Sequence, residues 1–241
     1  MEDTSSHPMV LISRLALDDI RWRTDAEDRL VQLGEPAIEP LIGALKNVNP
    51  TVRYHAVRAL TRFAERGHHA RLLPHLVERL ADTDNNSAVA IVAEKVLVHL
   101  GKTAVPALLG ASTDPARSQA VRARAVRALG KISRGVPIES VRPLLKDLDP
   151  AVRAQAATTV GTLAADGDMA LQGPARQELQ AMLTDTDKWV RHAAVEQLVA
   201  LRSGAGRAIL DEAEKDPEDK WWAQELVDQL DDLARTGELL P

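Results

Sequence analysis

Histidines and carboxylates are the groups in this sequence whose types and spacing could do chemistry. His68 and His69 are adjacent, and His75 follows one to two helical turns later, a spacing that could bring imidazole ligands to a metal. No acidic residue stands at a matching helical spacing, so we expect surface histidines, with no metal site and no cofactor. Asp231 and Asp232 are adjacent carboxylates in a charged terminal segment, where solvation is the simpler explanation.

The chain lacks the motifs of the common enzyme classes. It contains no cysteine, which excludes disulfides, thiolate zinc sites and a cysteine nucleophile. The G-x-S-x-G elbow of the hydrolases, the Walker loop and a G-x-G-x-x-G after a strand are also missing. We therefore predict no catalytic residues and expect that the protein is not an enzyme.

A recurring pattern, (D/N)-P-x-V-R-x-x-A-x-x-A-L, predicts the elements that position the charged side chains. It is found as NPTVRYHAVRAL at 49–60 and DPAVRAQAATTVGTL at 149–163, with variants at 121–132 and 187–201. Its period of about 30–38 residues indicates an array of helical repeats. Such arrays present extended surfaces and usually act by binding something.

Seven repeats align when the residue that follows the valine is taken as position zero of each second helix. Position zero is occupied by Arg23, Arg53, Ala90, Arg122, Arg153, Arg191 and Lys220. Three residues later, every repeat has alanine: Ala26, Ala56, Ala93, Ala125, Ala156, Ala194 and Ala223. A small residue repeated on one face lets helices approach closely, so this alanine column is predicted to be buried.

These repeats resemble the HEAT-repeat family, and more closely the short bacterial HEAT-like repeats of the phycobilin-lyase type. The resemblance covers residues 9–234 and implies an all-α, right-handed α-α superhelix (an α-solenoid) of about seven helix pairs. We therefore expect a flexible leader over 1–8, a single solenoid over 9–234 and a tail over 235–241.

The resemblance also implies a ladder of Asp–Arg pairs between neighbouring repeats. It would pair Asp149 with Arg153 or its neighbours, and Asp187 with Arg191. Ala90 replaces the arginine in the third repeat, so the ladder should be interrupted there. The position-zero arginines are accordingly interpreted as stacking devices rather than ligand contacts.

The net charge of −5 hides an uneven distribution along the chain. Residues 50–135 carry 14 Lys and Arg against 6 Asp and Glu, whereas residues 201–241 carry 5 against 11. The second helices of such arrays line the concave side, and positions +1, +5, +8 and +9 lie opposite their core face. Charges at these positions are therefore expected on the concave surface.

The +5 and +9 positions of repeats two to four predict a basic row on that surface. The row consists of Arg58, Arg62, Lys95, His99, Arg127 and Lys131. Tyr54 and Ile91 at +1 flank it, and Trp221 at +1 closes the acidic far end. Like charges four residues apart oppose helix formation, so the row favours partner binding over a simple solvated face. We predict these nine residues to be the partner-binding site.

The other tryptophans have structural interpretations. Trp22 occupies the valine position of its repeat and is expected in the core. Trp222 is expected to cap the last repeat, because terminal repeats must cover their open face.

We expect a cytoplasmic, non-catalytic scaffold or adaptor that binds an acidic segment of another protein. The N-terminus MEDTSSHP is unlike a signal peptide, and no apolar run approaches the ~20 residues that a membrane span needs. Self-association stays open, since the basic middle of one copy could meet the acidic end of another.

Two alternatives come from HEAT-like relatives. One is a phycobilin-lyase-like or chaperone role on a cofactor-carrying protein. The other is nucleic-acid binding like that of HEAT-like DNA glycosylases, which the pI of about 5.8 and the acidic flanks disfavour. The His-Glu dipeptides of the di-iron deoxyhypusine hydroxylases do not occur in the sequence.

Overall fold

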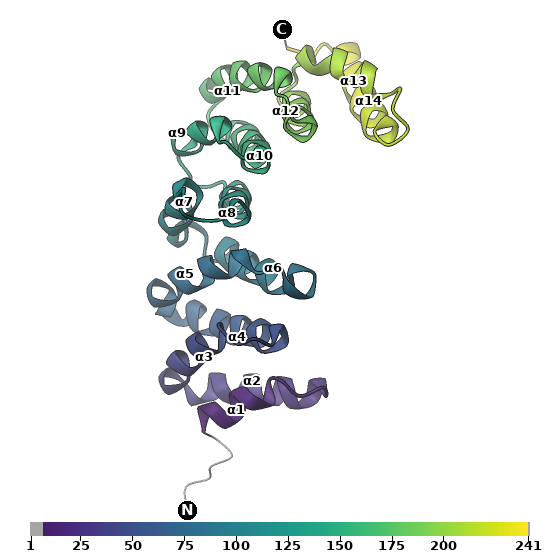
Figure 1. Cartoon of the computed structure of the whole chain (residues 1–241). Helices are drawn as coiled ribbons and strands as arrows, with labels where there is room; N and C mark the ends of the chain where they lie inside the picture. Colours follow the sequence, from purple (N-terminus) through teal and green to yellow (C-terminus); the bar gives the residue numbers. More distant parts are fainter. Residues whose placement is uncertain (1–6, 241) are drawn as a thin grey trace, which may run out of the picture. The chain divides into compact units, whose positions relative to one another are not determined.

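The computed structural model describes residues 7–240, apart from the side chains of Asn85 and Asn86, and within them the regular structure is helical (Figure 1). The chain divides into two compact bodies, Met1–Ala128 and Leu129–Pro241, here called the N-terminal body and the C-terminal body. Each is built from successive pairs of helices. The fold is an all-α solenoid of seven helix pairs, as the repeat pattern predicts.

The N-terminal body contains the first four pairs. They are α1 (Pro8–Arg14) with α2 (Ile20–Leu33), α3 (Ile38–Ala44) with α4 (Pro50–Phe63), α5 (His69–Glu78) with α6 (Asp84–His99), and α7 (Val105–Thr113) with most of α8 (Gln119–Ile132). Short turns adjoin them at η2 (Glu35–Ala37), η3 (Ala64–His68), η4 (Arg79–Ala81) and η5 (Gly101–Thr103).

The C-terminal body contains the remaining three pairs. They are α9 (Ile138–Val141), continued by η6 (Arg142–Lys146), with α10 (Pro150–Asp166), α11 (Met169–Ala181) with α12 (Lys188–Ala200), and α13 (Arg207–Ala213) with α14 (Lys220–Thr236). The turn η7 (Met182–Thr184) follows α11, and η8 (Gly204–Gly206) precedes α13.

Several of the second helices begin at a residue whose side chain caps them. Asn49 accepts a hydrogen bond from the backbone N–H of Thr51 at 2.9 Å, and Asp149 accepts from those of Ala151 and Val152. Pro50 and Pro150 occupy the first helical position, where an N–H has no partner within the helix. The Asn-Pro and Asp-Pro steps thus set the start of these helices.

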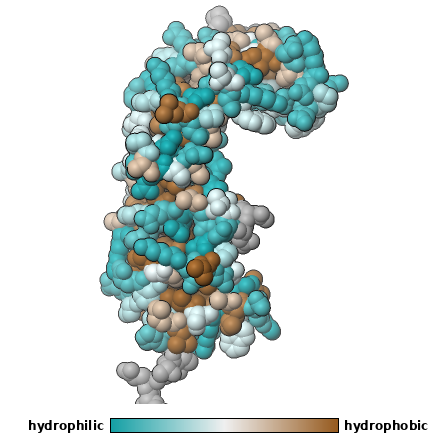
Figure 2. Space-filling view, viewed as in Figure 1, coloured by the Kyte–Doolittle hydropathy of each residue, from teal (hydrophilic) through white to brown (hydrophobic). Residues whose placement is uncertain are grey.

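The alanine column lies in the core of both bodies. All seven alanines at position +3 have 0% of their surface exposed. Leu, Val and Ile side chains fill the space around them, while hydrophilic side chains cover most of the surface visible in Figure 2. The prediction that this column is a packing device is confirmed.

The ladder exists, but its partners differ from those expected. Arg153 donates to both carboxylate oxygens of Asp185, at 2.8 and 2.9 Å, and not to Asp149. Asp149 and Asp187 are the N-caps of their own helices, where Oδ1 of each accepts hydrogen bonds from two backbone N–H groups. The position-zero guanidinium instead reaches the loop of the following repeat, two residues before that repeat's cap.

The expected pair of Asp187 with Arg191 is also replaced. Arg191 donates to the backbone carbonyls of Asp185 and Thr186, at 2.9 and 3.2 Å. A carbonyl contact of this kind recurs at the other position-zero arginines. Arg53, for example, bonds the carbonyls of Asn47 and Val48.

The third repeat departs from the ladder as its sequence predicts, because Ala90 has no donor. Arg124 on α8 fills the gap, donating to the carbonyls of Leu80 and Asp82 at 2.8 and 3.2 Å. The carbonyls of the third loop are therefore bonded by the following helix instead of their own.

The two ends differ in how they are covered. Trp22 is 53% exposed, so the expectation of a core residue is wrong. The helix beside it, α1, has only seven residues, and its packing does not bury so large a ring. Trp222 packs partly buried against the last core cluster, which includes Val195, Ala223 and Leu230.

The expected leader lies mostly outside the described residues, since the description begins at His7. His7 caps α1, which starts at Pro8. In the segment expected as a tail, the backbone N–H of Leu240 donates to the carbonyl of Arg202 at 2.7 Å. Glu238 forms an ion pair with Arg202 at 3.0 Å.

Candidate partner-binding site

One groove of the N-terminal body collects four of the nine predicted binding residues. Arg58 and Arg62 come from α4, and Lys95 and His99 come from the neighbouring helix α6. The groove has a volume of about 430 Å³, and its other lining residues are Glu27, Thr61, Val92 and Val96. The helical register therefore places these four basic side chains together, as the sequence predicts.

Carboxylates of neighbouring repeats pair with most of the basic row. Arg62 Nη1 lies 2.6 Å from Asp28, and Arg58 Nη2 lies 3.6 Å from Glu27. Farther along, Arg127 forms an ion pair with Glu94. Sequence reasoning missed these carboxylates, because each stands on the helix of the preceding repeat.

The other two basic side chains that line the groove are His99 and Lys95. His99 Nε2 lies 3.5 Å from Glu65, and both side chains are well exposed. Lys95 is exposed, and no ion pair of its ammonium group is found within the described residues. Lys95 is therefore the cation of the groove that offers its full charge to a partner.

Glu27, which lines the groove, forms a buried pair with His55. Glu27 and His55 are 4% and 3% exposed, and His55 Nδ1 lies 3.0 Å from Glu27 Oε2. Tyr54 packs edge-on against His55 at 5.3 Å between ring centroids, and the Arg58 guanidinium lies 5.9 Å from the Tyr54 ring. Glu27 thus holds both His55 and Arg58, and Tyr54 is half-buried rather than freely exposed.

The remaining predicted residues lie outside this groove. Ile91 on α6 is 44% exposed, and Arg127 follows on α8. Lys131 and Trp221 belong to the C-terminal body, where Trp221 is 78% exposed.

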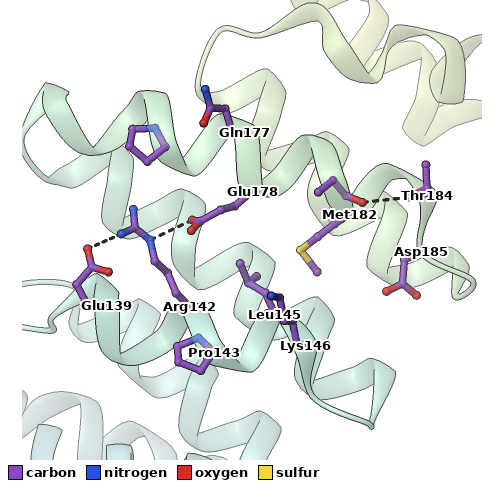
Figure 3. Close-up of a pocket in the computed structure, with 12 residues that line it drawn as sticks. Glu139, Arg142, Pro143, Leu145, Lys146, Gln177, Glu178, Met182, Thr184 and Asp185 are labelled. Carbon is purple, nitrogen blue, oxygen red and sulfur yellow. Dashed lines mark hydrogen bonds and ion pairs between the residues drawn. The ribbon is translucent and has the colours of Figure 1, made fainter.

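The C-terminal body has a larger groove that no sequence motif indicated (Figure 3). It has a volume of about 1080 Å³ and lies between the α9–η6 segment and the α11–η7 segment. Its charged centre is Arg142, whose Nε donates to Glu178 at 3.0 Å and whose Nη1 pairs with Glu139. Pro143, Leu145, Pro174, Ala181 and Met182 supply its apolar walls. Because Arg142 is neutralised internally, the groove carries no strong charge of its own.

Other site types are not found in the part of the chain that is described. Residues 7–240 contain no group of three or more His, Asp or Glu side chains that could hold a metal ion. None of the helices in this range combines the length and the apolar character needed to cross a membrane. His68 and His69 lie where η3 meets α5, beside the turn at Gly67.

Comparison with known families agrees with this architecture. The profile of a family described as HEAT repeats matches residues 9–98 and 138–230. The chain belongs to the HEAT-repeat family. No curated protein sequence matches it.

Several solved structures are similar to this chain. A protein of Escherichia coli, YibA, is 19% identical, with 91% of this chain and 80% of that one aligned at a TM-score of 0.52. Importin beta is 14% identical, with 92% of this chain and 35% of that one aligned at 0.59. The CpcE–CpcF complex of phycocyanin lyase from Nostoc is 22% identical over 94% of both chains, at 0.40. The HEAT-repeat fold suggests a protein-interaction scaffold, a class that is typically non-catalytic.

Two of the carboxylates that sequence reasoning missed occupy the same position of their HEAT repeats. Position +4 is Glu27 in the first repeat and Glu94 in the third. The following repeat has arginine at +5 in both cases, Arg58 and Arg127. Comparing adjacent rows of neighbouring helices, rather than each row alone, would have predicted that these charges pair.

Proposed function

We propose that this HEAT-repeat protein is a non-catalytic adaptor that binds an acidic segment of a partner protein in the groove of the N-terminal body. The observation that carries the proposal is the convergence of Arg58, Arg62, Lys95 and His99 on one groove. Arg127 on α8 continues the basic row, and Tyr54 and Ile91 offer apolar contact beside it.

The internal carboxylates orient the arginines without using all of their donors. A guanidinium has five N–H donors in a planar fork. Arg58 makes one contact with Glu27 at 3.6 Å, and Arg62 makes one with Asp28 at 2.6 Å. Both side chains are 43% exposed, so their outer N–H groups can meet a partner carboxylate. Lys95 would form the first ion pair, and the arginines would fix the direction of the segment.

The same carboxylates argue against nucleic acid as the partner. Binding to a phosphate backbone needs sustained positive charge, because affinity depends on the number of neutralised phosphates. In the N-terminal body, Glu27, Asp28 and Glu94 each offset one arginine of the row. A discrete acidic segment of a protein fits this alternating arrangement better.

Charge reversal at Lys95 tests the proposal with the least disturbance of the fold. Arg127→Glu would place a carboxylate beside the buried Glu94, and Arg58→Glu would do the same to Glu27. Lys95→Glu disturbs no internal ion pair that the structure shows. Lys102→Glu is the matched control, since it makes the same charge change at an exposed site outside the groove.

The experiment is an affinity pull-down from native cell extract, read by mass spectrometry. We expect a partner that the wild type and Lys102→Glu retain and Lys95→Glu loses, with retention falling as salt rises. Circular dichroism should show equal helicity for the three proteins. Equal recovery of every captured protein by Lys95→Glu and Lys102→Glu would overturn the proposal.

A further inference from the structure

Three of the four tryptophans gather on helices α12 and α14 of the C-terminal body. Trp222 stacks on His192 with ring centroids 4.0 Å apart and planes 18° apart. Trp189 packs edge-on against the His192 ring, with 5.5 Å between the ring centroids. Trp221 precedes Trp222 in the sequence and lies in the first turn of the same helix, one residue after Lys220.

Two of these tryptophans are mostly exposed. Trp222 covers the core cluster of the last repeat, and its Nε1 donates to Glu196 at 2.8 Å. Trp189 and Trp221 are 66% and 78% exposed. The last repeat is thus already capped by Trp222, and the exposed indoles beside it are of the kind that anchors protein contacts.

The surroundings of these rings are acidic. Residues 216–228 carry five Asp and Glu against one Lys. Trp221, Glu225 and Asp228 stand at i, i+4 and i+7, so they share one face of α14. Glu196 adds a carboxylate from α12, where it bonds Trp222.

The protein itself shows which group suits this chemistry. Lys188 places its ammonium 2.6 Å from Asp219 and 5.4 Å from the centre of the Trp189 ring. An internal lysine is therefore held between a carboxylate and an indole face. Trp221 and Glu225, which share one face of α14, offer the same two kinds of group, and the described chain places no cation over the Trp221 ring.

We propose that this aromatic–acidic face, made of Trp189, Trp221, Glu196, Glu225 and Asp228, binds a lysine- or arginine-rich segment of a partner protein. A side-chain cation of that segment would lie over the Trp221 ring and pair with Glu225, as Lys188 does with Trp189 and Asp219. Charge complementarity selects a basic segment over an acidic or purely apolar one. The inference does not depend on the proposed function, which concerns a groove of opposite charge in the other body.

The test measures binding of a fluorescein-labelled lysine- and arginine-rich peptide by anisotropy, with a glutamate-rich peptide of equal length as the comparison. We expect saturable binding of the basic peptide only. Trp221→Ala and Glu225→Gln should each weaken binding about tenfold. Asp166→Asn is the matched control, because it removes one exposed carboxylate of the same body outside this face and should leave binding unchanged.

A second readout locates the peptide directly. In a Trp22→Phe background, the three remaining tryptophans all lie on α12 and α14, so intrinsic fluorescence reports this face alone. We expect the basic peptide to change that fluorescence with the same affinity as the anisotropy gives. Lys95→Glu should leave both signals intact, which separates this inference from the proposed function.

Three results would overturn the inference. The first is no binding of the basic peptide, and the second is equal binding by Trp221→Ala and wild type. The third is concentration-dependent dimerisation in analytical ultracentrifugation that Trp221→Ala abolishes, which would assign the face to a second copy of the chain. Because Trp221 is largely exposed, its replacement should not unfold the protein.

Discussion

The ion pair between Arg53 and Asp82 should be the most costly single contact to break in the N-terminal body. Arg53 Nε lies 2.6 Å from Asp82, and the two side chains are 7% and 4% exposed. Arg53 also pairs with Asp84 at 2.6 Å. Hydrogen bonding to Asp82, opposed by burial, raises the pKa of Arg53, so its charge is present at every accessible pH.

Arg53→Met would remove the cation and leave Asp82 buried without its partner. Breaking a buried pair in this way costs about 3–5 kcal/mol, because the remaining charge is still desolvated. The carbonyls of Asn47 and Val48 also lose a donor, but Val48 is 94% exposed and water can replace it there. The expected loss is therefore about 3–5 kcal/mol of local stability in repeats two and three.

Hydrogen exchange of the backbone amides of α4 and α6 measures the loss of stability in each of the two repeats. A local measurement is needed because repeat arrays need not unfold in one step. Urea unfolding followed by circular dichroism gives the total. The double variant Arg53→Met/Asp82→Leu should recover most of the loss, since it removes the orphaned carboxylate. Arg29→Met is the control: it breaks an exposed pair with Asp25 and should cost only about 0.3–0.5 kcal/mol. A loss below about 1 kcal/mol for Arg53→Met, or no recovery in the double variant, would refute the reasoning.

Three further predictions concern the C-terminal body. The hydrogen bond from Arg153 lowers the pKa of Asp185, so its stabilisation is present above about pH 4, the unfolded value, and is lost as pH falls through the lower folded pKa. The difference in urea midpoint between wild type and Asp185→Asn should accordingly shrink on acidification below pH 4, and a constant difference would contradict it. Burial, with smaller contributions from Lys188 and Arg191 against Asp219, lowers the pKa of His192. Stability should therefore fall as pH drops from about 6.5, the unfolded value, toward the folded pKa, and His192→Phe should remove that part of the pH dependence of urea unfolding. Ala156→Leu should cost about 1–3 kcal/mol by overpacking a fully buried site, whereas Ala151→Leu at an exposed site should stay within about 0.5 kcal/mol in the same assay.

Much of the fold follows from local sequence. The Asn49-Pro50 and Asp149-Pro150 steps mark the starts of α4 and α10, because the cap and the first-turn proline act within a few residues. The alanine column predicts the buried face because every repeat meets its neighbours through the same register. Positions +5 and +9 lie on the same face of each second helix, so the basic row also follows from local sequence. Helices α4 and α6 bring its first four members into one groove.

Only the tertiary structure decided which partner each charge takes. Arg153 pairs with Asp185 of the following repeat, whereas Asp149, which is nearer in the sequence, caps its own helix. Glu27 and Glu94 lie on preceding repeats, so their neutralisation of Arg58 and Arg127 depends on how adjacent helices stack.

Burial at the ends was also decided by tertiary structure. Trp22 occupies a core position of the repeat, yet it is 53% exposed, because the seven-residue helix α1 beside it does not cover so large a ring. Trp222 is partly buried and Trp221 is 78% exposed, although the two are adjacent, because Trp222 packs against the last core cluster and stacks on His192 of α12. Sequence periodicity determines which face of a helix a residue occupies, and the neighbouring repeat determines whether that face meets protein or solvent.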